Sequence, residues 1–389
     1  MESGGIVMLV RIAIENFRSF KRRTVIDLTK TQYTALTDTN TYQGLVKGLV
    51  LVGGNASGKS TVLEAIRLLL DLLFLERKMD NPLFLCLFGN SKEYSIEYTF
   101  RINGHEIDYM IRNNVEQKVL GEELVVDGQT LLTRMGSTAR SSIGGFEKQY
   151  AEKEVGPNTL FLRTLFFNTG FASDEVLRLW FEFLQGSVYY NAFERTPVSY
   201  GNQELDIEPF LEDHGAKKIS DFFERHGMKQ TIEYATEVET ERGIRIALKE
   251  GKMPFFRRQD CDIVVPYPEE SLGNRLLIRF LPSYLTVMNK PGLFLVDEFS
   301  SGFHNDLEEL LIREWMEKAR DSQLIVVTHS TNLLSTSLLR PDQIYSVSFA
   351  DGEGSRIKRF SEEGPRVAQN LEKMYRSGVF GGIPEYDSD

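Results

Sequence analysis

Apolar runs alternate with longer amphipathic stretches along this chain, and the arrangement predicts an α/β fold. Residues 49–52 form a continuous apolar run that predicts a buried strand, and the composition and length of residues 62–70 favour a helix. Two further apolar runs, at residues 293–298 and 324–329, also predict buried strands, with a helix at residues 305–319 between them. Strands that alternate with helices in this way are typical of a sheet covered by helices.

A second pattern, strict alternation of apolar and polar positions, follows the first helix. Residues 94–102 and 106–112 alternate on either side of Asn103-Gly104, a pair that favours a tight turn. Further strands are predicted within residues 119–132, so this part is expected to form an antiparallel meander with one buried face. The remaining predictions for this half are strands at residues 7–14 and 24–28 and a Ser/Gly-rich loop at residues 136–145.

The middle of the chain is predicted to be mainly helical. Residues 158–225 carry apolar positions at helical spacing, interrupted by a polar loop at residues 196–203, and strands return at residues 232–240 and 244–249. No heptad pattern is sustained over several turns, so long coiled-coil arms are not expected. Later helices are predicted at residues 276–285 and 368–375.

The glycine-rich segment after the first buried strand has the spacing of a phosphate-binding loop. It reads GGNASGKST from Gly53 to Thr61, between a strand and a helix, which is the context such a loop needs. Its glycines let backbone N–H groups face an anion, Lys59 brings a positive charge to the outer phosphates, and the Ser60 hydroxyl can bind Mg²⁺. We therefore predict binding of a nucleoside triphosphate, taken as ATP, with Mg²⁺, through Gly53, Asn55, Gly58, Lys59, Ser60 and Thr61.

Two acids close the apolar run at residues 293–298. A carboxylate at the C-terminal tip of a parallel strand faces the ligand crevice of an α/β sheet. We predict that Asp297 holds Mg²⁺ and that Glu298 acts as the general base on the attacking water. The alternative is a pair of ordinary surface acids at an exposed strand end.

Two further signals complete the predicted site. His329 closes another apolar strand and is predicted to hydrogen-bond the γ-phosphate, the alternative being a packed or solvated histidine. Ser271 and Gly273 lie at the start of an apolar helix, where a hydroxyl, an open backbone and the helix dipole together favour an anion. A second anion site so far along the chain predicts a triphosphate bound between two subunits; an ordinary serine helix cap is the alternative.

The composition is that of an ordinary globular chain. The 389 residues are 41% hydrophobic and 26% charged, and no stretch approaches the ~20 apolar residues of a membrane span. The polar start predicts no signal peptide, and Met8 is an alternative start to Met1. Cys86 and Cys261 fit neither a disulfide framework nor a metal site, which favours the cytoplasm. The net charge of −11 leaves DNA binding open but does not indicate it.

In this order, the elements resemble the ATP-binding-cassette-like heads of the SMC, RecF and OLD ATPases over nearly the whole chain. The opening VRIAIENFRSF at residues 10–20 is similar to the start of that group. The ending NLEKMYRSGVFGGIP at residues 370–384 and the acidic segment DEFSSGFH at residues 297–304 resemble compact bacterial AAA/ABC-type ATPases of abortive-infection and phage-defence operons. The resemblance implies an α/β P-loop NTPase of ABC type, with a mixed sheet, an antiparallel β-lobe and a mainly helical insertion.

The resemblance also implies roles for individual residues. It assigns Glu298, His329 and Lys59 to catalysis, with His329 as the switch histidine, and Ser60 and Asp297 to the metal. The remaining assignments are Ser271 and Gly273 to a signature motif that acts on the partner's ATP, and Arg18 to the surroundings of the nucleotide. The signature reads Ser-Leu-Gly-Asn instead of Ser-Gly-Gly-Gln, which puts the tightness of the ATP sandwich in question, and no Gln loop is evident.

These observations predict three parts and a function. Residues 1–157 would be an ATPase N-lobe with the phosphate loop and the meander, residues 158–250 a mainly helical insertion ending in a β-hairpin, and residues 251–389 a C-lobe with the signature, the acidic strand and the switch histidine. The resemblance implies a cytoplasmic ATPase subunit of an anti-phage, abortive-infection complex that forms a homodimer or higher assembly around ATP. No toxin chemistry is visible, so a separate nuclease or toxin from the same operon and a phage-encoded trigger are the expected partners, with no membrane. The alternatives are a RecF- or SMC-like DNA-repair ATPase and a slowly hydrolysing scaffold.

Overall fold

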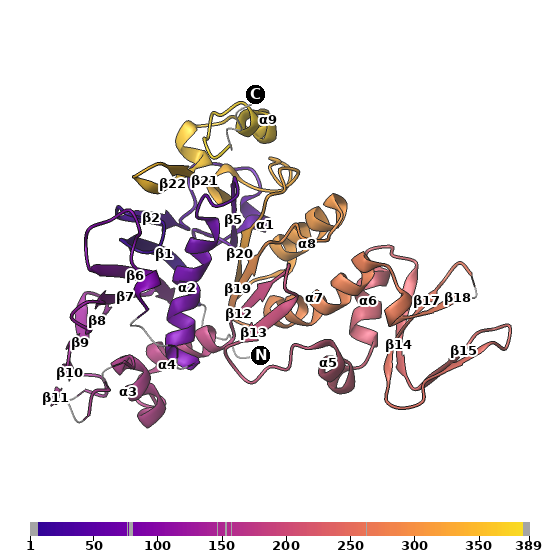
Figure 1. Cartoon of the computed structure of the whole chain (residues 1–389), viewed down its shortest axis with the longest axis horizontal. Helices are drawn as coiled ribbons and strands as arrows, with labels where there is room; N and C mark the ends of the chain where they lie inside the picture. The colour runs from indigo at the N-terminus through magenta and orange to yellow at the C-terminus, as the bar shows by residue number, and fades with distance from the viewer. Residues whose placement is uncertain are drawn as a thin grey trace.

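The protein is built around two large sheets with helices between and beside them (Figure 1). The structure, a computed structural model, describes residues 7–75, 77, 81–145, 147–151, 154–156, 158–261 and 263–383. The predicted polar start at residues 1–5 and the last residue of the tail motif, Pro384, lie outside this part. None of the described helices is both long and apolar enough to cross a membrane.

The central sheet is mixed and has seven strands. Its five inner strands are mutually parallel, and an antiparallel strand is added at each edge. The order is β13 (Thr196–Ser199), β12 (Val188–Asn191), β19 (Gly292–Asp297), β20 (Ser322–Val327), β5 (Gly48–Gly53), β21 (Ile344–Ala350) and β22 (Gly354–Arg359).

Both faces of this sheet are buried, which explains why its strands read as continuous apolar runs. Leu49 and Leu51 face one core, together with the antiparallel sheet and the helices α2, α3 and α4. Val50 and Val52 face the other core, against α7 and α8. The helices are α2 (Lys59–Phe74), α3 (Phe161–Thr169), α4 (Glu175–Gln185), α7 (Leu272–Met288) and α8 (Asn305–Lys318).

The second sheet is the predicted antiparallel meander, extended at both edges to eight strands. Its order is β11 (Lys148–Tyr150), β10 (Thr138–Ser141), β9 (Gln129–Met135), β8 (Val119–Val126), β7 (His105–Asn114), β6 (Glu93–Ile102), β1 (Val7–Glu15) and β2 (Thr24–Asp27). The loop predicted at residues 136–145 is wrong in part, because β10 lies inside it. Ala139 and Ser141 are buried there and pair with β9, which outweighs their weak strand preference.

The helix-rich middle part is not a separate insertion in the structure. Strand β12 lies beside β19 in the central sheet, and the polar loop predicted at residues 196–203 contains the edge strand β13. Both strands are short and contain polar residues, so they lack the apolar run that identifies the other central strands. The three-part division therefore stays a prediction, and the first half of its middle part belongs to the main fold.

A smaller unit projects from the side of the central sheet, at the right of Figure 1. It contains a three-stranded sheet in the order β14-β17-β18 and a separate two-stranded ribbon. The boundary predicted at residue 250 falls inside it, because β14 and β17 lie on opposite sides of that residue. Its elements are α5 (Ile207–His214), α6 (Lys217–Arg225), β14 (Gln230–Ala235), β15 (Glu237–Glu239), β16 (Arg245–Ala247), β17 (Met253–Arg258) and β18 (Ile263–Pro266).

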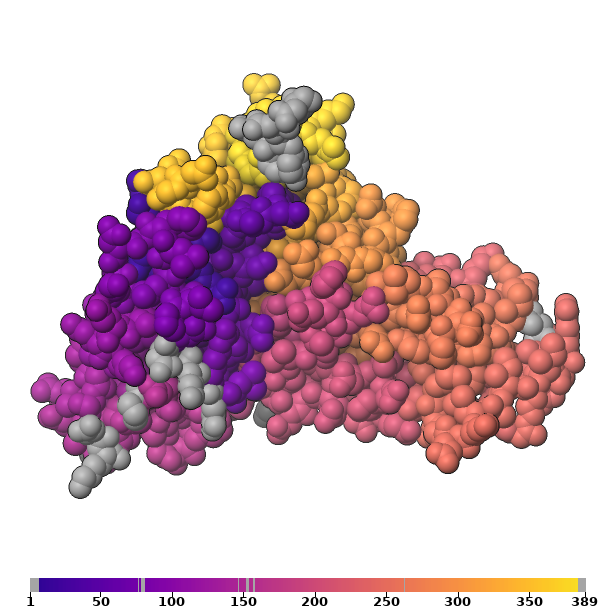
Figure 2. Space-filling model, in the orientation of Figure 1, coloured from indigo at the N-terminus to yellow at the C-terminus, as the bar shows by residue number. Residues whose placement is uncertain are grey.

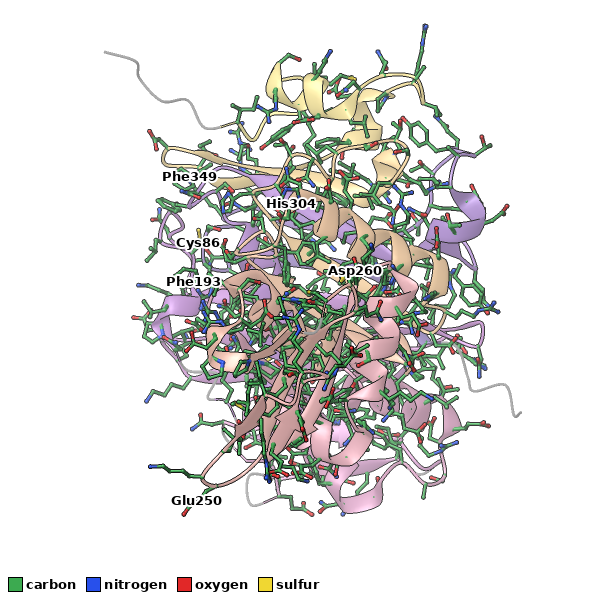
Figure 3. All side chains as sticks on the ribbon, turned by 90° about the vertical axis from the view of Figure 1, so that its right-hand side faces the viewer. Cys86, Phe193, Glu250, Asp260, His304 and Phe349 are labelled. Carbon is green, nitrogen blue, oxygen red and sulfur yellow. The ribbon has the colours of Figure 1, made fainter. Side chains whose placement is uncertain are left out.

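The C-terminal segment folds back over the main body. After β22 it forms a 3₁₀ turn at Phe360–Glu363 and the helix α9 (Leu371–Arg376). Figure 2 shows this yellow segment resting on both the indigo N-terminal part and the orange part. In the side view of Figure 3, Phe349 on β21 lies at the upper left, below the yellow C-terminal segment, and Glu250, in the projecting unit, lies at the lower left.

The remaining short elements lie between β2 and β5, in the loop after α2, before α7 and before β21. They are α1 (Thr37–Asn40), β3 (Thr41–Tyr42), β4 (Leu45–Val46) and the 3₁₀ turns Pro82–Phe84, Tyr267–Glu269 and Pro341–Gln343. The predicted fold class, an α/β P-loop ATPase fold with a mixed sheet and an antiparallel β-lobe, is confirmed by the order and direction of the strands.

Candidate nucleotide-binding site

The phosphate loop joins the end of β5 to the start of α2, as predicted. Gly58 precedes the first residue of α2 with a φ of 103°, a conformation that favours glycine. A side chain there would also collide with its surroundings, because a Cβ would lie 2.2 Å from Ser355 Oγ and 2.6 Å from Ser19 Oγ. The loop is therefore held tightly from one side, which fixes the direction of its backbone N–H groups.

Lys59 is the first residue of α2 and is buried within this loop. Its Nζ donates hydrogen bonds to the carbonyl oxygens of Gly53 at 2.9 Å and Gly54 at 2.8 Å. Burial lowers the pKa of Lys59 to about 8, although the nearby carboxylates of Glu298 and Asp297 favour the charged form. A bound phosphate would replace the two carbonyl contacts, and its negative charge would raise the pKa of Lys59 towards the ordinary value.

Ser60 and Asp297 meet although they are far apart in the sequence. Ser60 Oγ donates to Asp297 Oδ1 at 3.1 Å, and burial raises the pKa of Asp297 above its ordinary value. A hydroxyl and a carboxylate are the hard oxygen ligands that Mg²⁺ prefers, and Mg²⁺ takes one or two protein ligands beside phosphate and water. Ser57 Oγ is buried nearby with no partner among the described residues, which also fits a polar ligand.

Glu298 and His329 lie opposite each other at the same edge of the sheet. His329 Nε2 is 3.7 Å from Glu298 Oε2, and both side chains are about one-third exposed, at 35% each. Burial lowers the pKa of His329, and the positive charge of Lys59 acts in the same direction. Glu298 has a φ of 54°, a left-handed conformation that is unusual for glutamate and that occurs where function constrains the backbone.

These positions follow from the topology of the central sheet. Strands β5, β19 and β20 are parallel, so their C-terminal ends lie at one edge, and that edge carries Lys59, Asp297 and His329. The structure thus brings together the phosphate loop, the two acids and the histidine. One face of the edge is left open to solvent through Ser60 and Asn55, which are exposed.

Ser271 and Gly273 lie elsewhere. Ser271 is the N-cap of α7, accepting a hydrogen bond from Asn274 N at 3.4 Å, and both Ser271 and Gly273 are exposed. No hydrogen bond or ion pair within the described residues links them to the phosphate loop. The cap interpretation is therefore correct within one chain, and a contact with a partner's nucleotide stays a prediction.

The start of α7 is braced from below by a buried carboxylate. Glu270 accepts hydrogen bonds from Ser271 N at 2.7 Å and Asn274 Nδ2 at 3.0 Å, and from Arg258 Nη2 at 2.6 Å. Burial alone would raise the pKa of Glu270, but these donors hold it below its ordinary value. Arg258 comes from β17, and Gln230 on β14 also contacts Asn274, so the projecting unit supports this helix end.

Arg18 approaches the flank of α2 and not the phosphate loop itself. Its Nη2 lies 3.2 Å from Glu64 Oε1, and its backbone is left-handed, with a φ of 51°. The neighbouring Ser19 is the residue that reaches the loop region, with its Oγ 3.1 Å from Thr61 Oγ1. The expectation that Arg18 lies near the nucleotide stays a prediction. In the structure, the guanidinium group of Arg18 forms an ion pair with Glu64 on α2.

Sequence reasoning missed two contributors from the end of the chain. Ser355 Oγ donates to Ser57 O at 2.6 Å, so β22 supports the loop from behind. The amide of Gly54 donates to the carbonyl oxygen of Gly382 at 3.0 Å, which places the C-terminal segment on the loop. Isolated serines and glycines carry no sequence signal for such contacts, because the partners are brought together only by the fold.

Two family models match separate parts of the chain. An "AAA ATPase domain" model matches residues 8–125, which contain the phosphate loop, and a model described as "AAA domain, putative AbiEii toxin, Type IV TA system" matches residues 261–335, which contain Ser271, the two acids and His329. No curated protein matches the chain. The two matches and the geometry of the sheet edge together support an ATPase of AAA/ABC type.

Solved structures of SMC heads are similar to this chain along most of its length. The SMC head domain from Thermotoga maritima is 15% identical, covers 90% of this chain and 98% of its own, and has a TM-score of 0.49. An SMC head bound to the C-terminal winged-helix domain of ScpA is 16% identical, with coverage of 95% and 99% and a TM-score of 0.48. A Pyrococcus furiosus SMC head bound to the C-terminal domain of ScpA is 13% identical, with coverage of 96% and 98% and a TM-score of 0.45.

Proposed function

We propose that this protein is a Mg²⁺-dependent ATPase subunit that assembles around ATP and controls a separate effector in anti-phage defence. The observation that carries the ATPase part is the meeting of Lys59, Ser60, Asp297, Glu298 and His329 at the C-terminal edge of the parallel strands. Each side chain has the chemistry that phosphoryl transfer requires. Lys59 and Ser60 are held by the start of α2, Asp297 and Glu298 by the end of β19, and His329 by the loop after β20.

In this proposal the chain's own groups divide the work of hydrolysis. The phosphate-loop amides and Lys59 bind the phosphates and stabilise charge that develops on them. Ser60 and Asp297 would hold Mg²⁺, which neutralises phosphate charge when it is bound. Glu298 orients the attacking water and accepts its proton, while the neutral His329, 3.7 Å away, is placed to donate a hydrogen bond to the terminal phosphate.

The ATPase part is tested by measuring phosphate release from Mg·ATP by the purified full chain. We expect turnover that requires both Mg²⁺ and Lys59. Titration with fluorescent ATP and GTP analogues in the same buffer determines the preferred base. A wild-type chain that binds neither nucleotide would rule out the proposal.

Assembly around ATP is supported by the exposed start of α7. Ser271 and Gly273 face solvent, no atom lies within 4 Å of a Cβ placed on Gly273, and Leu272 is 49% exposed. A helix N-terminus that is braced internally but open externally is suited to a phosphate from another copy. Mass measurement of the Glu298→Gln variant with and without Mg·ATP tests this, and we expect at least a dimer only with ATP.

Control of a separate effector rests on the family resemblance and on the AbiEii-type match at residues 261–335. Expression with the neighbouring genes and purification through a tag on this chain should yield a second subunit with nuclease or toxin activity. A chain that instead binds DNA only in the presence of ATP, in gel shifts at several salt concentrations, would favour the DNA-repair alternative.

A further inference from the structure

The C-terminal segment is firmly packed on the central sheet. Phe380 is 1% exposed and stacks on Phe360, with the ring centroids 3.7 Å apart and an interplanar angle of 10°. Ser346 Oγ on β21 donates to Phe380 O at 2.5 Å, and Tyr375 OH donates to Gly382 O at 2.9 Å. Residues 371–383, which we call the tail, therefore have a defined docking position; Figure 1 shows α9 above β21 and β22.

The first contact between the tail and the nucleotide site is made by backbone atoms. Gly382 O accepts the hydrogen bond from the amide of Gly54, the second residue of the phosphate loop, at 3.0 Å. Gly382 has a φ of +78°, and a Cβ there would lie 3.1 Å from Ser346 Cβ and 3.2 Å from Val347 O. Only glycine fits this conformation and this space without strain, so the contact depends on the residue type at this position.

The second contact is made with the loop that carries His329. Thr331, two residues further on, donates from Oγ1 to Glu372 Oε1 at 2.8 Å and accepts from Arg376 Nη2 at 2.8 Å. Arg376 and Glu372 also form an ion pair at 2.9 Å on α9. The tail thus contacts two segments of the site: the phosphate loop, through Gly382, and the loop that follows His329, through Glu372 and Arg376.

A cavity of about 770 Å³ adjoins the first of these contacts, with both Gly54 and Gly382 in its lining. The phosphate loop forms one wall with Gly54, Asn55 and Ser57, while β21 and the tail form the others. Arg376 lines it and brings a positive charge next to the phosphate loop. If the phosphate loop moves when an anion binds, the tail that contacts the loop must move with it or lose that contact.

We propose that the tail is a positioning element of the nucleotide site, holding the phosphate loop through Gly382 and the His329 loop through Thr331, so that nucleotide binding and tail docking stabilise each other. The inference rests on the proposed ATPase function and adds residues to it. Coupling between two binding events is reciprocal, so a nucleotide that prefers the docked loop must also strengthen docking of the tail.

The decisive variant is Gly382→Ala, with Gly128→Ala as the matched control. Gly128, in the turn between β8 and β9, has a φ of +79° and nothing within 4 Å of a Cβ, so alanine there carries the same backbone strain without a collision. We expect Gly382→Ala to raise the Kd and KM for Mg·ATP about tenfold or more, a loss of one good hydrogen-bonded contact. Gly128→Ala should leave both unchanged, and equal values for the two variants would overturn the inference.

Thr331→Val tests the second contact by a different readout. It removes the hydroxyl that joins α9 to the His329 loop and keeps the shape of the side chain. We expect kcat to fall about threefold to tenfold with KM nearly unchanged, because a hydrogen bond of about 1 kcal/mol is lost on the histidine side only. A purely structural tail would instead change kcat and KM together with the midpoint of thermal unfolding, and that result would count against positioning.

Hydrogen exchange of the unmodified protein tests the coupling even if Gly382→Ala does not fold. With saturating Mg·ATP, we expect exchange in peptides covering residues 371–383 to slow at least about tenfold, while β8 and β9 remain unchanged. ATP binding without a change in tail exchange would overturn this inference and leave the ATPase proposal intact. Absence of ATP binding would overturn the ATPase proposal itself.

Discussion

The edge of the central sheet and the start of α7 are two parts of the predicted site that are built in opposite ways. At the sheet edge, Lys59 and Asp297 are buried and have shifted pKa values because neighbouring strands surround them. At α7, Ser271 is exposed and only the supporting Glu270 is buried. The desolvated ammonium group of Lys59 binds phosphate strongly without further burial, whereas an exposed helix cap becomes effective only when another surface covers it. Under the proposed function, a single chain would bind the nucleotide at the sheet edge, and a partner copy would be needed to enclose it.

The largest expected effect concerns the chemistry at the sheet edge. Glu298→Gln keeps the shape and the backbone of the residue but removes the proton acceptor, so turnover should fall about 10²- to 10⁴-fold with ATP binding retained. Phosphate release and nucleotide titration measure the two separately. The exposed Glu317→Gln on α8 is the control and should match the unmodified protein. Undiminished turnover in the Glu298→Gln variant would mean that Glu298 is not the general base.

Loss of the buried lysine is expected to act on binding. Lys59→Ala removes the charge and the donor at the phosphate loop, and we expect the Kd for Mg·ATP to rise about 100-fold. Titration with a fluorescent ATP analogue measures it, with the exposed Lys30→Ala as the control. If affinity stayed the same, the burial of Lys59 would have only a structural role, and the contrast with α7 would disappear.

The shifted pKa of Lys59 predicts a dependence on pH. In the free protein this pKa is about 8, so below pH 8 the lysine is charged and ready for phosphate, and above pH 8 it must first take up a proton. The affinity for Mg·ATP should therefore fall above pH 8, by up to about tenfold per pH unit. The same titration in the Lys59→Arg variant should show a flatter profile, because a guanidinium keeps its charge. A flat profile in the unmodified protein would contradict the shift.

The smallest effect is expected at α7. Ser271→Ala removes the cap, at a cost of about 1 kcal/mol in stability, and an equal loss at a partner's phosphate would lower turnover about fivefold. The control Asp174→Ala removes the cap of α4, where Asp174 Oδ1 accepts from Leu177 N at 3.0 Å, at a similar cost in stability. The ATPase rate, measured as a function of protein concentration, distinguishes the loss of a helix cap within one chain from the loss of a contact with a partner's phosphate. Equal rates in both variants would show that the start of α7 is only a helix cap.

Much of the site could be predicted because its signals are local. The phosphate loop, the apolar strands and the acids after β19 are each defined by neighbouring residues, and the parallel arrangement then brings Lys59, Asp297 and His329 to one edge. The strands β12, β13 and β17 were missed because they are short and partly polar, and because β12 joins the central sheet through β19, which lies far away in the sequence. Strand formation at such positions depends on tertiary pairing more than on the residues themselves.

By itself the sequence determined the P-loop α/β class, the meander and the identity of the groups that meet at the edge of the central sheet. Those features depend on periodicity and on fixed spacing within one strand, loop or helix. Only the tertiary structure decided that Glu270 and Arg258 brace the start of α7, and that the Gly382 carbonyl meets the Gly54 amide. Glu270 and Arg258 belong to different elements, and Gly54 and Gly382 are far apart in the sequence, so only the fold brings each pair together. A hydrogen bond between backbone atoms does not restrict the residue type, except where space and φ admit only glycine, as at Gly382.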